Sequence, residues 1–141
     1  MNSILLQAKD LLIKEKYTCV FTNGELTFSS TRRGVAPLLE LIDSENDYRG
    51  YFAADKVVGA GAAYLYVILG VSEIWAHTVS QAALNVLEKH SVTCFYDNCV
   101  SHIVNRTGDG VCPMERAVEN ASSPEDALNK IKKALENLKK L

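Results

Sequence analysis

Apolar residues near the start of the chain recur every three to four positions, which is the spacing of one face of an α-helix. The residues in this pattern are Ile4, Leu5, Ala8, Leu11 and Leu12. Two short apolar runs follow, Cys19–Phe21 and Leu26–Phe28, and they flank the dipeptide Asn23-Gly24, which is typical of a tight β-hairpin. The pattern therefore predicts a helix followed by a hairpin.

The middle of the chain alternates between helix-like and strand-like segments. The predicted elements are a helix over Val35–Ile42 with Pro37 in its first turn, a strand over Tyr48–Ala53, a strand over Ile74–Val79, a helix over Gln81–Lys89 opened by Ser80, and a strand over Val92–Tyr96. Alternation of this kind favours the α/β class, with a mostly parallel sheet that carries helices on both faces.

The longest apolar run, Val57–Val71, is interrupted only by the hydroxyls of Tyr64 and Tyr66. The run is shorter than the roughly 20 residues that a helix needs to cross a membrane. It therefore predicts a buried helix and no membrane partner. Asp55 is expected to cap this helix.

The last segment of the chain predicts a further helix. It begins with a capping serine, Ser123, and with Pro124 at the first helical position. Its apolar stripe consists of Leu128, Ile131, Leu135 and Leu138. The lysines of this segment lie mostly off the stripe, and we interpret them as a solvated face, with a docking surface for an anionic partner as the alternative.

Composition restricts the class of protein. The chain has 141 residues, of which 48% are hydrophobic, so a single domain over residues 1–141 is expected. A formal net charge of −2 gives no broad basic surface, which argues against duplex nucleic acid as a partner. The start of the chain lacks the pattern of a secretory signal, and a cytoplasmic location is expected. The cysteines, Cys19, Cys94, Cys99 and Cys112, are then expected to be free thiols.

The segment from Asn105 to Glu115 has the composition of a binding or catalytic loop. Pro113 suits the first position of a helix, which puts Cys112 at the positive end of the helix dipole, where a thiol ionises more readily. Cys112 is therefore a candidate nucleophile, and the alternative is a small buried residue where a loop enters a helix. The candidate ligand-binding residues around it are Asn105, Arg106, Thr107, Gly108, Gly110 and Glu115. Their structural alternative is a turn held by Asn and Asp side chains.

A second candidate binding segment contains Arg33 and Gly34, which follow a run of hydroxyl residues and precede the helix predicted from residue 35. A guanidinium group and backbone N–H groups at a helix start suit a phosphate or a carboxylate. An anionic ligand is therefore the expected partner of this segment.

Four motifs give the chain a family resemblance. They are Arg33-Gly34-Val35-Ala36-Pro37-Leu38-Leu39, Asp55-Lys56-Val57-Val58-Gly59, Leu69-Gly70-Val71, and Asn105-Arg106-Thr107-Gly108-Asp109-Gly110-Val111-Cys112-Pro113-Met114-Glu115. On these motifs the chain resembles an uncharacterised branch, a domain of unknown function, of the cytidine-deaminase-like superfamily. The resemblance implies one three-layer α/β/α domain with a mixed sheet and a cleft at the strand ends.

The chain departs from the zinc enzymes of that superfamily. Those enzymes hold zinc with a histidine or cysteine at the start of one helix and two cysteines at the start of the next. At the corresponding positions this chain has Asp55-Lys56-Val57-Val58 and Ser80-Gln81-Ala82-Ala83, which disfavours zinc-dependent deamination. Another metal site is not expected, because Cys94, Cys99, His102 and Cys112 include only one close pair. No motif indicates a cofactor.

Two functions remain open at this point. The resemblance puts Asp55 and Lys56 where the superfamily carries out its chemistry, so they are candidate catalytic residues beside Cys112, and the alternative is a helix cap with a solvated lysine. The first function is the binding of a small anionic or nucleotide-like ligand, with Cys112-dependent chemistry. The second is that of a catalytically inactive scaffold, which acts through a protein partner or as a homo-oligomer.

Overall fold

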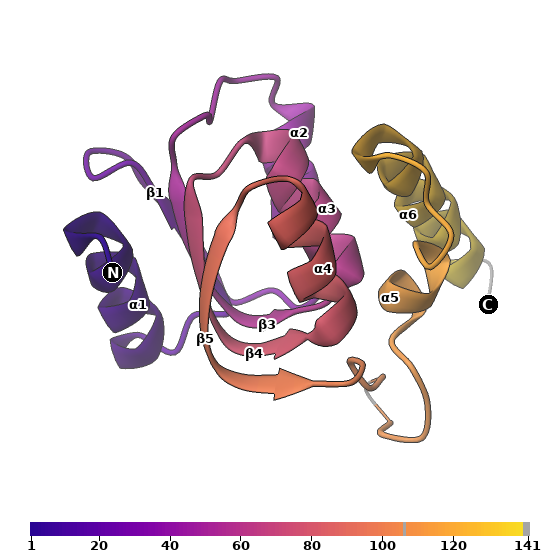
Figure 1. Ribbon diagram of the computed structural model, residues 1–141. Coiled ribbons are helices and arrows are strands. Elements are labelled where there is room, and N and C mark those ends of the chain that lie inside the picture. Colours follow the sequence, from indigo (N-terminus) through magenta and orange to yellow (C-terminus); the bar gives the residue numbers. More distant parts are fainter. Residues whose placement is uncertain (106, 140–141) are drawn as a thin grey trace.

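The computed structural model describes residues 1–105 and 107–139, and these residues contain a mixed five-stranded sheet in the order β2-β1-β3-β4-β5 (Figure 1). The strands are β1 (Cys19–Thr22), β2 (Thr27–Ser30), β3 (Phe52–Val58), β4 (Glu73–Ser80) and β5 (Thr93–Val100). Strand β1 pairs antiparallel with both β2 and β3, whereas β3, β4 and β5 are parallel. The mixed sheet expected from the resemblance is confirmed.

Helices cover both faces of the sheet and complete the three layers. They are α1 (Ser3–Lys14), α2 (Ala36–Asp43), α3 (Ala60–Leu69), α4 (Gln81–Lys89), α5 (Pro113–Ala117) and α6 (Pro124–Lys139). Figure 1 shows α1 alone on one side of the sheet and the other helices on the opposite side. The predicted α/β class is therefore confirmed. No helix within residues 1–105 and 107–139 is long and apolar enough to cross a membrane.

The first helix is amphipathic, as its sequence pattern predicts. Its buried residues Leu5, Ala8 and Leu12 follow helical spacing and pack into a cluster that includes Trp75 of β4. The Asn2 side chain accepts a hydrogen bond from the backbone N–H of Ile4 and so caps the first turn. These contacts fix α1 over β1, β3 and β4.

The third strand and the buried helix differ from the prediction. The strand predicted over Tyr48–Ala53 is displaced along the chain, because β3 begins at Phe52. Val57 and Val58 extend β3 through their pairing with Thr78 and Val79, and the helix predicted from Val57 begins only at Ala60. β-Branched residues fit a pleated strand well, and an apolar run does not show where a buried strand ends and a buried helix starts.

The remaining elements follow their predictions more closely. Helix α4 has the predicted bounds, and the Ser80 hydroxyl accepts a hydrogen bond from the backbone N–H of Ala83 at its start. Strand β5 runs on to Val100, beyond the predicted end at Tyr96. The hairpin turn is wider than expected, because the Asn23 side chain accepts hydrogen bonds from the backbone N–H groups of Glu25 and Leu26, and β2 begins only at Thr27.

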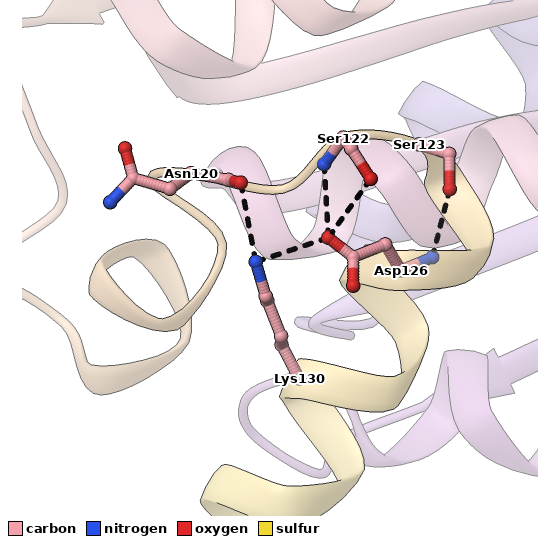
Figure 2. Close-up of polar contacts among 5 residues, drawn as sticks. All are labelled: Asn120, Ser122, Ser123, Asp126 and Lys130. Carbon is pink, nitrogen blue, oxygen red and sulfur yellow. Dashed lines mark hydrogen bonds and ion pairs between the residues drawn. The ribbon is translucent and has the colours of Figure 1, made fainter.

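Helix α6 begins in a network of polar contacts (Figure 2). The Ser123 hydroxyl accepts from the backbone N–H of Asp126, and the Asp126 carboxylate accepts from the backbone N–H of Ser122. Lys130 Nζ lies 3.0 Å from Asp126 Oδ2 and donates to the carbonyl oxygen of Asn120. The predicted start is therefore confirmed, and its polar contacts join α6 to the preceding loop.

The apolar stripe of α6 faces the interior of the chain. Ile131 is fully buried, and Leu128 and Leu135 pack against the same core. Helix α6 contacts α3 and α5. Most of this stripe is therefore internal core.

Candidate functional site

Asp55 lies inside strand β3, and this corrects its expected position at the start of a helix. The residue pairs with Cys19 of β1 and with Ala76 of β4, and α3 begins at Ala60. At about 3.3 Å per strand residue, Asp55 precedes Gly59 by about 13 Å. Asp55 therefore does not cap α3.

The Asp55 side chain instead belongs to a group that we call the Asp55 cluster: Asp55, Tyr66 and Cys19. The Tyr66 hydroxyl donates a hydrogen bond of 2.6 Å to Asp55 Oδ2 and lies 3.4 Å from Cys19 Sγ. The backbone N–H of Val57 donates to Asp55 Oδ1 at 3.2 Å. The cluster joins β1, β3 and α3 on the face of the sheet opposite α1.

Burial controls the ionisation of the Asp55 cluster. It raises the pKa of the Asp55 carboxyl to about 7, against the lowering effect of the hydrogen bonds from Tyr66 and from backbone N–H groups. Burial also raises the pKa of the Cys19 thiol well above its ordinary value, with the Asp55 charge as the second cause. The cluster therefore contains a carboxyl that exchanges its proton near neutral pH and a thiol that stays protonated.

Sequence analysis missed Cys19 and Tyr66 as members of a polar cluster. Cys19 is separated from Tyr66 by 47 residues, and no local motif reports such a contact. Tyr66 is only 11 residues from Asp55, but their hydrogen bond could not be predicted, because the helix start was misplaced. The two tyrosine hydroxyls that interrupt the apolar run were the only available signal.

The segment with Arg33 and Gly34 lies at the same end of the sheet as Asp55. Ser30, at the end of β2, pairs with Cys19, which in turn pairs with Asp55. Two steps between neighbouring strands span about 10 Å. Thus the loop that contains Arg33 starts about 10 Å from Asp55 across the sheet.

The side chains of this loop point toward solvent. Arg33 is exposed, and a Cβ built on Gly34, which has φ +74°, meets no described heavy atom within 4 Å. Arg32 forms an ion pair with Glu40. Lys56 is also exposed, and its backbone N–H donates to the carbonyl oxygen of Thr18. Both Arg33 and Lys56 can therefore approach a ligand without being removed from a buried contact.

Glu115 forms a second polar centre, which we call the Glu115 junction. Its Oε2 accepts from the backbone N–H of Ala60 at 2.6 Å and from the Ser80 hydroxyl at 2.9 Å. Its Oε1 accepts from the backbone N–H of Ile103 at 2.9 Å. The side chain is buried, and the residue is 5% exposed. A ligand-binding role for Glu115 stays a prediction, and it requires the carboxylate to leave these three donors.

The glycine-spaced loop before Cys112 forms a turn held by its own side chains. The Asn105 side chain donates to Asp109 Oδ1 at 3.0 Å, and the Thr107 hydroxyl donates to the same oxygen. Thr107 is the main reason that the pKa of Asp109 is lowered. These contacts match the structural alternative for Asn105 and Thr107. The predicted ligand residue Arg106 lies outside the described residues, and Gly108 and Gly110 lie within the turn.

Cys112 directly precedes α5, as predicted, but its thiol does not cap the helix. Its backbone N–H donates to the carbonyl oxygen of Ile103, and its side chain packs against the core. Among residues 1–105 and 107–139, no hydrogen bond links Cys112 to Asp55 or Lys56. The three candidate catalytic residues therefore do not form one bonded group, and the role of Cys112 stays a prediction.

We also searched the rest of the described structure for a pocket or a metal site. A groove of about 540 Å³ lies between α4 and β5, and its lining includes Leu87, Cys94 and Tyr96 but none of the predicted site residues. In the described part of the chain, no group of three His, Cys, Asp or Glu side chains could hold a metal ion. The start of α3 is formed by Gly59 and Ala60, which also supply no side chain that could bind zinc.

Comparison with known proteins gives a family. The sequence model of "TM1506: Domain of unknown function (DUF1893)" matches residues 7–135. A crystal structure of a DUF1893 family protein, TM1506 from Thermotoga maritima, is similar with a TM-score of 0.83 and 24% identity, over 97% of this chain and 92% of that chain. No curated protein matches the chain. Neither match extends to cytidine deaminases, so that wider kinship stays a prediction. Because the family model spans residues 7–135, the chain belongs to the DUF1893 family.

Proposed function

We propose that this protein binds a small anionic or nucleotide-like ligand at Asp55, in the middle of β3, on a deaminase-like fold without zinc chemistry. The observation that carries the proposal is the half-buried Asp55 carboxyl, whose pKa is raised to about 7 and which Tyr66 holds from α3. A carboxyl whose pKa is strongly raised is a typical recognition or acid–base group. In this proposal Asp55 is the principal polar contact of the ligand.

The proposed ligand has two polar ends. The Asp55 carboxyl accepts a hydrogen bond from the ligand when ionised and donates one when protonated. Arg33 supplies positive charge for a phosphate or carboxylate, and the backbone at Gly34 permits close approach. A separation of about 10 Å between the loop start and Asp55 suits a molecule with a donor-bearing head and an anionic tail.

Cys112 is not required by this proposal. Helix α5 has only 5 residues, so few aligned peptide dipoles act on the thiol. Iodoacetamide alkylation followed by peptide mapping tests whether the Cys112 thiol is unusually reactive. We expect Cys112 to react no faster than the exposed Cys99, and a much faster reaction of Cys112 would restore thiol chemistry to the function.

The test of the proposed function is a ligand titration followed by ¹H–¹⁵N NMR. The probes are four nucleoside monophosphates and their nucleosides. We expect one of the monophosphates to shift resonances of β3 and of the loop at residues 31–35. Asp55→Asn should weaken its binding about tenfold, and Arg33→Ala should weaken the monophosphate about fivefold while leaving the nucleoside unchanged.

The matched control for this titration is Arg49→Ala, because Arg49 is an exposed arginine that pairs with Asp47. This variant should bind like the unaltered protein. Shifts that Asp55→Asn leaves unchanged, or the absence of any shift with all eight probes, would contradict a ligand site at Asp55 for this class of molecule.

A second candidate function is self-association through β5. This strand forms an edge of the sheet over 8 residues, most of its residues are exposed, and Tyr96 is 45% exposed. Long exposed edge strands readily pair with another chain. Sedimentation velocity across a hundredfold range of protein concentration tests this candidate. A dimer that Tyr96→Lys dissociates would favour it, and a monomer throughout would remove it.

A further inference from the structure

We propose that α5 acts as an internal ligand: its Glu115 carboxylate fills an oxyanion-binding site that α3, α4 and the loop segment at Ile103 form between them. When this carboxylate is removed, the site takes a small external carboxylate in its place. The proposal goes beyond the ligand site at Asp55 and does not rest on it.

Three donors from separate parts of the chain converge on the carboxylate. The backbone N–H of Ala60 belongs to the first turn of α3, and the Ser80 hydroxyl belongs to the residue that caps α4. The third donor is the backbone N–H of Ile103. Donors from two helix starts therefore converge on Oε2, and Ile103 bonds Oε1, which is an environment that binds anions.

The backbone around the site is shaped for this occupant. A Cβ on Gly59 would lie 2.6 Å from Glu115 Oε2, and a Cβ on Gly61 would lie 3.2 Å from the carbonyl oxygen of Met114. A Cβ at Gly59 would displace the Glu115 carboxylate, and one at Gly61 would require the backbone at Met114 to shift by a few tenths of an ångström. The two glycines thus let the Glu115 carboxylate and the α5 backbone that carries it approach α3 closely.

The occupant reaches the site from a distant part of the sequence. Glu115 is 55 residues from Ala60 and 35 residues from Ser80. Its segment therefore behaves as a tethered ligand, whose high effective concentration excludes a free anion from the intact protein. Removal of the side chain leaves the donors without an acceptor, and buried donors without an acceptor favour the uptake of any oxyanion of suitable size.

The test is chemical rescue of Glu115→Ala by sodium formate. Thermal unfolding is followed in formate and in sodium chloride of equal ionic strength at pH 7.5. At a tenfold excess over its dissociation constant, formate should raise the Tm of Glu115→Ala by about 4 °C more than it raises the Tm of the unaltered protein. An equal shift in both proteins would overturn the proposal.

Two control variants sharpen the test. Glu119→Ala removes an exposed carboxylate from the residues just after α5 and should respond to formate like the unaltered protein. Glu115→Gln keeps the side-chain volume, so the site stays filled and formate should have no extra effect. An extra effect on Glu115→Gln as large as that on Glu115→Ala would overturn the proposal, because the anion would then bind elsewhere.

If Glu115→Ala does not fold in chloride, the recovery of folding in formate is measured instead of the Tm. The unfolded variant is then diluted into formate, and recovery of the native circular dichroism spectrum supports the proposal, whereas no recovery at any formate concentration overturns it. Phosphate in place of formate separates a general oxyanion site from a carboxylate site. Asp55→Asn combined with Glu115→Ala should retain the formate response, so failure of this inference is distinguishable from failure of the Asp55 proposal.

Discussion

The Asp55 cluster and the Glu115 junction each contain a carboxyl, half-buried in Asp55 and buried in Glu115, and the two differ in how well the carboxyl is hydrogen bonded. Glu115 accepts from two backbone N–H groups and one hydroxyl. Asp55 accepts from one hydroxyl at 2.6 Å and from one backbone N–H at 3.2 Å, and burial raises its pKa to about 7. The well-coordinated carboxylate is thus satisfied within the fold, while the poorly coordinated one has a raised pKa, which is why we propose it as the ligand contact.

The largest expected effect is that of Glu115→Ala. The substitution leaves three donors without their acceptor, so we expect the free energy of unfolding to fall by about 4 kcal/mol. Urea unfolding at pH 7 measures it. The control Glu119→Ala should change stability by less than about 0.5 kcal/mol. If the two variants were equally stable, the Glu115 junction would have no structural role.

Gly59→Ala should have the next largest effect. Its new Cβ would lie 2.6 Å from Glu115 Oε2, so the carboxylate must move, and we expect a loss of about 3 kcal/mol. A double-mutant cycle sharpens the comparison. In the Glu115→Ala background the same glycine substitution should cost less than about 1 kcal/mol. Additive losses would show that Gly59 and Glu115 do not act together.

The raised pKa of the Asp55 carboxyl should make the stability of the protein depend on pH. Its pKa is about 7 in the folded state and about 3.9 in an unfolded chain, so the folded state binds more protons between these values. Stability relative to Asp55→Asn is therefore greatest below pH 4 and falls as pH rises to 7. For a half-buried group we expect a total fall of about 2 kcal/mol. Urea unfolding of both proteins at several pH values measures this stability difference. A difference that rises with pH would contradict a raised pKa of Asp55 in the folded state.

Tyr66→Phe should have the smallest effect on stability among these four predictions. It removes the donor to Asp55 Oδ2, and a hydrogen bond to an ionised carboxylate is stronger than one to a neutral carboxyl. We expect a loss of about 1.5 kcal/mol at pH 8 and about 0.5 kcal/mol at pH 5. Tyr64→Phe in the same helix is the matched control. A loss that does not depend on pH would place the hydroxyl outside the titration of Asp55.

Local signals account for the parts of the fold that the sequence predicted well. Ser80 before an amphipathic segment marked the start of α4, and Ser123 with Pro124 marked the start of α6. The boundary between β3 and α3 was misplaced because both are apolar there. In a parallel sheet covered on both faces, a buried strand and a buried helix share the same composition, so composition alone did not separate Val58 from Ala60.

The candidate site was less predictable than the fold because its contacts are distant in sequence. Asp55 was selected for a position at a helix start that it does not occupy, although the structure gives it a perturbed pKa for a different reason. Glu115 was selected as a ligand contact, and its bond to Ala60 spans 55 residues. A pair of residues that meet only after the sheet has formed leaves no periodic signal in either segment.

The most direct test of this account is a pH titration of the side-chain carboxyl carbons by ¹³C NMR, with the Asp55 signal assigned by its loss in Asp55→Asn. We expect the Asp55 carboxyl to titrate with a pKa of about 7 and ligand binding to displace this value. An Asp55 carboxyl that titrates near 4, as an exposed aspartate does, would contradict the claim that this cluster is the reactive site of the protein.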